Sequence, residues 1–160
     1  GLYGTTLGYT HAGLFYTISA VSMIIIRMIS KHFMDTVPAI KTMTGAVACG
    51  ILCCLMLLAA PYGEPVFLAS GIFYGLATGI SLPLNQSVAV KNTPPERWGA
   101  ANALFLLAND IGIGFASVIW GVINDSFGFQ TSIVCVIVCL IASYASAWIV
   151  YPARDKRWRH

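Results

Sequence analysis

Asp110 is the one acidic residue that falls deep inside a long apolar segment of this chain. The segment begins near Gly99, so at 1.5 Å per residue Asp110 lies about 16 Å along a helix, near the middle of a hydrocarbon core about 30 Å thick. An ionised carboxylate at that depth costs several kcal/mol unless a partner or water compensates. Two roles fit: a neutral acid that exchanges its proton with a cavity, or a permanently hydrogen-bonded structural acid.

Three amide side chains are further candidates for contact with a solute. Asn85 and Gln86 follow Pro83 near the end of an apolar segment, where amides either hydrogen-bond a substrate or join neighbouring helices. Asn109 adjoins Asp110 but points about 100° away from it on a helix, so the two cannot face one cavity equally. We therefore place Asp110, Asn85, Gln86 and Asn109 on a substrate or proton pathway, with Asp110 first.

Charged residues at a spacing of four could form an inner gate, in which ion pairs make and break across an interface between helices. Arg27, Lys31 and Asp35 would stack on one face if the helix continued through them, so either base could pair with Asp35. The plainer interpretation is an ordinary basic loop between two membrane segments. Arg97, just before another apolar segment, completes the candidate gate residues.

The elements that must hold these residues are membrane helices. The hydrophobic fraction is 58% and the charged fraction 9%, against roughly 45–50% and 25% in soluble domains. Five apolar segments are long enough to cross a bilayer: 12–30, 42–60, 66–90, 99–123 and 131–151. The chain is therefore predicted to be an all-α integral membrane protein, and its net charge of +3 is no sign of nucleic-acid binding.

All nine Lys and Arg residues fall on one side of this map. The connections 61–65 and 124–129 on the other side carry only acids. Cytoplasmic loops retain Lys and Arg, so the N-terminus is predicted outside and the tail, 152–160, in the cytoplasm. A chain with five spans that opens on Gly1 also indicates a fragment whose upstream part is missing.

Glycines mark two predicted packing faces, because close backbone approach supplies contact energy between helices in lipid. They are Gly71, Gly75 and Gly79 in the third segment, and Gly112, Gly114 and Gly121 in the fourth. The five cysteines lie within apolar segments without the ligand spacing of a zinc site, so no metal or cofactor is expected.

An enzyme in the membrane would need clustered carboxylates or a His, Asp and Ser arrangement at its surface. His11 and His32 fall on opposite sides of the predicted membrane, and no two acids lie close together within a span. An enzyme is therefore disfavoured. A membrane receptor or scaffold, even one with a transporter-like fold, is a further possibility.

Two stretches resemble the major facilitator superfamily. The frame Arg27, Lys31, Asp35, Pro38 and Lys41 is similar to its cytoplasmic-loop signature, with Lys31 and Pro38 in place of the family's glycines. The stronger likeness is to the region from the tenth to the twelfth helix. It consists of Pro83-Leu84-Asn85-Gln86, Pro94-Pro95-Glu96-Arg97-Trp98-Gly99-Ala100-Ala101-Asn102-Ala103, Asp110-Ile111-Gly112-Ile113-Gly114, Gly121 and Asp125-Ser126-Phe127-Gly128.

This resemblance implies that the chain is helices eight to twelve of a twelve-helix transporter in the plasma (inner) membrane, with its N-terminal part missing. It implies secondary active transport of a small solute by alternating access between two six-helix halves. Proton coupling is expected from Asp110. Asp35 would bias the inner gate, and Arg97 would begin a helix that lines the interface between the halves.

Overall fold

The computed structural model describes residues 2–91 and 93–155, without the side chains of residues 2, 31–36 and 149–155. All regular structure in these ranges is helical, as predicted. The α-helices are α1 (Leu2–Thr6), α2 (Leu14–Thr36), α3 (Ala39–Leu58), α4 (Glu64–Lys91) and α5 (Trp98–Asp155), with short 3-10 helices at η1 (Ala60–Tyr62) and η2 (Pro95–Arg97).

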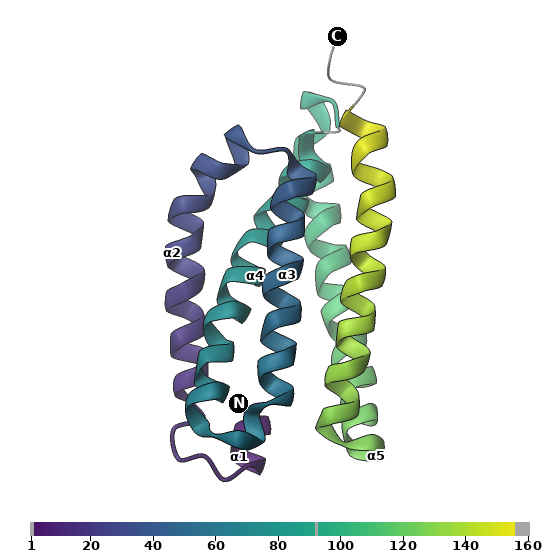
Figure 1. Ribbon diagram of the computed structural model, residues 1–160. Coiled ribbons are helices and arrows are strands. Elements are labelled where there is room, and N and C mark those ends of the chain that lie inside the picture. The colour runs from purple at the N-terminus through teal and green to yellow at the C-terminus, as the bar shows by residue number, and fades with distance from the viewer. Residues whose placement is uncertain (1, 92, 156–160) are drawn as a thin grey trace.

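The helix α5 contains two of the five predicted passes. Its helical geometry breaks at Gly128, where φ is 79° and ψ is 168°, and the chain doubles back there (Figure 1). We call 98–127 the first arm and 129–155 the second arm. A residue with a Cβ rarely adopts this backbone conformation, so glycine allows the reversal within one residue. The chain thus reverses within the predicted connection 124–129, but the connection is shorter than expected because only Gly128 leaves the helix.

The first predicted connection is also shorter than expected. The sequence suggested a loop from Arg27 to Lys41, but α2 continues to Thr36 and α3 begins at Ala39. Arg27, Lys31 and Asp35 therefore all lie within one helix. Pro38 precedes the first turn of α3, where its missing N–H costs no hydrogen bond. The short helix α1 was not predicted.

Three described helices are long and apolar enough to cross a membrane: Ala39–Leu58, Glu64–Lys91 and Pro95–Trp148, the last including both arms of α5. Leu14–Ser30 is a shorter apolar helix. Successive passes alternate in direction (Figure 1), so Lys41, Lys91 and Arg97 gather at one end and Glu64 and Asp125 at the other. We call these the basic end and the acidic end.

The helices pack in a row in which α2 lies against α4, α4 against α3, and α3 against α5 (Figure 1). The closest approach joins α2 and α4. A Cβ built on Gly71 would lie 3.0 Å from the carbonyl oxygen of Phe15, and one on Gly75 would overlap the carbonyl oxygen of Ser19. Gly79 similarly leaves room for Ile26. Three glycines one turn apart thus let two backbones meet.

An aromatic cluster closes the acidic end. Phe15 and Phe67 stack with ring centroids 5.2 Å apart, and both are buried with Ala12 and Ala60. The Tyr9 hydroxyl donates to the Ala60 carbonyl oxygen at 2.5 Å. These contacts fasten the segment between α1 and α2 over the turn that joins α3 to α4.

Candidate functional site

Asp110 lies midway along the first arm of α5, and its side chain is exposed. No described residue forms a hydrogen bond or ion pair with its carboxylate. Gly114, Ser117 and Gly121 follow at spacings of four, three and four, so they lie on the same face of the helix as Asp110. All of them are exposed as well. This small and polar face of α5 therefore has room for water, solute or another helix beside the acid.

Ser117 was not among the residues singled out from the sequence. Its hydroxyl donates to the carbonyl oxygen of Gly114 at 2.8 Å, which satisfies it within the helix. The signal for it was available, because Ser117 stands seven residues after Asp110, a spacing that places both on one helix face. A hydroxyl that bonds to a carbonyl oxygen of its own helix costs little in a membrane helix.

The amides of the predicted pathway separate into different environments. Gln86 donates from Nε2 to Oδ1 of Asn102 at 2.5 Å, which joins α4 to the first arm of α5. Asn85 and Asn109 are half-buried. Asn102 is eight residues before Asp110, about 12 Å along the helix. The Gln86–Asn102 pair therefore lies nearer the basic end than the acid does, at a separate level of the bundle.

Hydrogen bonds between polar side chains of membrane helices are worth about 0.6–2 kcal/mol each. The Gln86–Asn102 bond is of this kind, since it joins two helices that otherwise touch only lightly. This geometry favours the interhelical role of Gln86 over direct substrate contact in the conformation described. Asn102 belongs to the motif that carried the family resemblance, but its partner could not be read from the sequence.

The candidate gate is only partly visible. Arg27 and Arg97 have exposed side chains. The side chains of Lys31 and Asp35 lie outside the described residues, so the proposed pairing with Asp35 stays a prediction. Arg97 ends η2 immediately before α5, where its backbone N–H donates to the carbonyl oxygen of Pro94 at 2.9 Å.

The two predicted glycine faces have different surroundings. Gly71, Gly75 and Gly79 meet α2, as described above. Around Gly112, Gly114 and Gly121, a Cβ would meet nothing within 4 Å. Packing at these three positions stays a prediction, and it would require an element other than the described helices.

Metal-binding groups do not assemble in the part of the chain that the structure describes. No three His, Cys, Asp or Glu residues there come close enough to hold an ion, and its five cysteines are unbridged.

Comparison with known proteins places the chain in context. The family model described as Major Facilitator Superfamily matches residues 2–160. The chain is 26% identical over 159 residues to the staphylopine export protein of Staphylococcus aureus strain Mu50, an alignment that covers 95% of the chain and 40% of that relative. The chain thus spans about two-fifths of the relative's length. No solved structure matches.

Proposed function

Because this chain belongs to the Major Facilitator Superfamily, we propose that it forms part of a proton-coupled carrier that moves a small solute by alternating access. Membership of the family makes it a portion of an integral membrane transporter. The class of solute, the coupling ion and the direction of transport are our proposals. Few charges lie along the spans, which favours a neutral, amphiphilic or weakly anionic solute.

The observation that carries the proton coupling is the position of Asp110. Its carboxyl lies on an exposed face of small and polar residues, midway along the first arm of α5. An ionised carboxylate in the hydrocarbon region costs several kcal/mol unless water or a partner compensates for it. In a carrier that opens to each side in turn, a group of this kind takes up a proton on one side and releases it on the other.

The proposed direction is export. The similar protein of Staphylococcus aureus is named an export protein, which supports outward movement but does not identify the solute. The alternative of a receptor with a transporter-like fold predicts binding without flux. Coupling through a residue in the part of the protein outside this chain would leave Asp110 with a structural role.

Reconstituted full-length protein provides the test. In proteoliposomes with an imposed pH gradient, we expect staphylopine or another solute from a panel of neutral and weakly anionic compounds to accumulate against its gradient. A protonophore should abolish that accumulation, and liposomes without protein are the control. Saturable binding of a solute without flux would contradict the carrier and support the receptor.

We further propose that the basic end faces the cytoplasm. Lys41, Lys91 and Arg97 lie there, and retention of basic residues on the cytoplasmic side supports this orientation. A cysteine at Tyr62, which is 90% exposed at the acidic end, should react with a membrane-impermeant maleimide in intact cells. A cysteine at Lys91 should react only after permeabilisation, and the reverse pattern would invert the proposed orientation.

A further inference from the structure

The segment before α2 lies across the acidic end of the bundle and contacts two separate parts of it. We call residues 3–12 the strap. Near its end, the Tyr9 hydroxyl donates to the carbonyl oxygen of Ala60, at the turn between α3 and α4. At its start, the ring centroid of Tyr3 lies 5.0 Å from that of Phe129, just after the bend of α5. The strap therefore joins the α3–α4 turn to the α5 bend.

The end of the strap is anchored to α4 as well. The backbone N–H of His11 donates to Oε1 of Glu64 at 2.9 Å. Glu64 stands in the first turn of α4, where the helix dipole favours a carboxylate. The ring of Tyr9 also packs against that of Phe67, with centroids 5.9 Å apart. Hydrogen bonds and a ring contact thus fix this part of the strap to the α3–α4 turn.

The helix α1 is joined to these anchors by a glycine cap. Gly8 has a φ of 78°. Its N–H donates to the carbonyl oxygen of Thr5 at 3.0 Å, and the N–H of Tyr9 donates to that of Gly4, also at 3.0 Å. This is the Schellman pattern, which ends a helix at a glycine. A helix of five residues does not persist alone, so the position of α1 depends on the cap and on the anchors that follow it.

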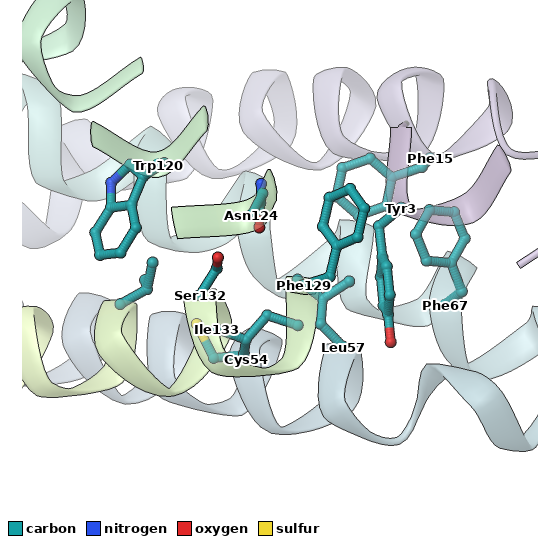
Figure 2. A pocket seen from close by; sticks show the side chains of 11 residues that line it. Tyr3, Phe15, Cys54, Leu57, Phe67, Trp120, Asn124, Phe129, Ser132 and Ile133 are labelled. Atoms are coloured by element: carbon teal, nitrogen blue, oxygen red, sulfur yellow. The ribbon is translucent and has the colours of Figure 1, made fainter. Parts of the chain in front are cut away.

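The strap covers a hollow at the acidic end. Figure 2 shows Tyr3 between Phe129 and Phe67, with Cys54 in the same lining. Cys54 lies one turn before the end of α3, and its side chain is only 6% exposed. Tyr3 itself is half-buried and Thr5 is exposed. Segments with so little buried surface open at a low free energy, without unfolding the rest of the protein.

We propose that the strap is a lid, in which α1 lifts from Phe129 to open the acidic end and returns to close it. The contact of Tyr3 with Phe129 is between rings, so breaking it strands no buried hydrogen-bonding group. The anchors at Ala60 and Glu64 set the position to which α1 returns. The role of this lid in transport rests on the proposed alternating access, but its movement can be measured without flux and does not involve Asp110.

The rate at which a thiol reagent modifies Cys54 measures the opening. The protein is the full-length chain in lipid nanodiscs, with Cys54 as its sole cysteine, and the probe is a charged methanethiosulfonate. Tyr9→Phe keeps the ring but removes the hydroxyl that donates to Ala60, so labelling should become at least about fivefold faster. Tyr62→Phe removes a hydroxyl from a residue at the same end that is 90% exposed, and it should leave the rate unchanged.

Two glycine variants loosen the strap in a second way. A Cβ on Gly8 or on Gly13 would meet nothing within 4 Å, but only Gly8 has a positive φ, at which a side chain is strained. Gly8 and Tyr9 are not among the described residues that line the hollow, so changing them does not remove its wall. Gly8→Ala should also accelerate labelling at least about fivefold, and Gly13→Ala should not.

Unchanged labelling of Cys54 in either Tyr9→Phe or Gly8→Ala, with the protein monodisperse, would overturn the lid. The same holds if Cys54 in the protein with an unaltered strap reacts as fast as the thiol of Tyr62→Cys, because the hollow would then be open while the strap is in place.

Discussion

Replacing Asp110 by Asn is expected to abolish solute flux driven by a pH gradient while leaving the protein folded. Asparagine has the shape of the neutral acid but cannot release a proton, so the carrier would lose the step that links proton movement to solute movement. We expect pH-driven accumulation to fall at least about tenfold, to the level of liposomes without protein. The measurement is initial uptake into proteoliposomes at a fixed pH difference.

A second transport mode distinguishes coupling from damage. Exchange of labelled for unlabelled solute at equal pH needs no net proton movement, so the Asp110→Asn protein should retain it. Asp110→Glu keeps the carboxyl and should recover part of the pH-driven flux. Asp125→Asn makes the same chemical change at an exposed position beside the Gly128 bend and should have little effect.

A contrary result would favour the other role of Asp110. Unchanged pH-driven flux in Asp110→Asn would remove it from the proton pathway. Loss of expression or of a monodisperse peak would instead identify a structural acid whose hydrogen bonds are made outside the described helices. The two results differ in protein yield, so a single preparation decides between them.

The helices themselves could be predicted because their signal is local. An apolar run of about twenty residues satisfies its backbone internally only as a helix when it lies in lipid, and each of the five runs is helical in the structure. The ends were harder to place. Helical hydrogen bonding continues through polar residues wherever it is not interrupted, so α2 extends to Thr36 and only Gly128 interrupts α5.

The candidate site could be predicted only in part, for a related reason. Asp110 is conspicuous because one acid in an apolar run is visible without knowledge of its neighbours. The Gln86–Asn102 bond depends on how α4 approaches α5. The burial of Oδ1 of Asn124 without a hydrogen-bond partner among the described residues depends on how the helices pack around it. Neither spacing nor composition contains that tertiary information, so these features appeared only in the structure.

Replacing Gly75 by Leu is expected to cause the largest loss of stability of any single change at the glycines of α4. A Cβ at this position already overlaps the carbonyl oxygen of Ser19 and would lie 2.7 Å from Cβ of Ser22. A backbone atom cannot move aside like a flexible side chain, so α2 must separate from α4. Overpacking of this kind costs about 1–3 kcal/mol and sometimes more, and α2 makes most of its contacts with α4.

Thermal unfolding of the full-length protein in detergent, followed by the monodisperse fraction after heating, measures this loss. Gly45→Leu is the matched control, because Gly45 lies in α3 and a Cβ there meets nothing within 4 Å. Gly75→Ala should fall between the two, since it adds only the first clashing atom. Equal midpoints for Gly75→Leu and Gly45→Leu would mean that α2 and α4 do not meet through this glycine, and the packing described for the two helices would be wrong.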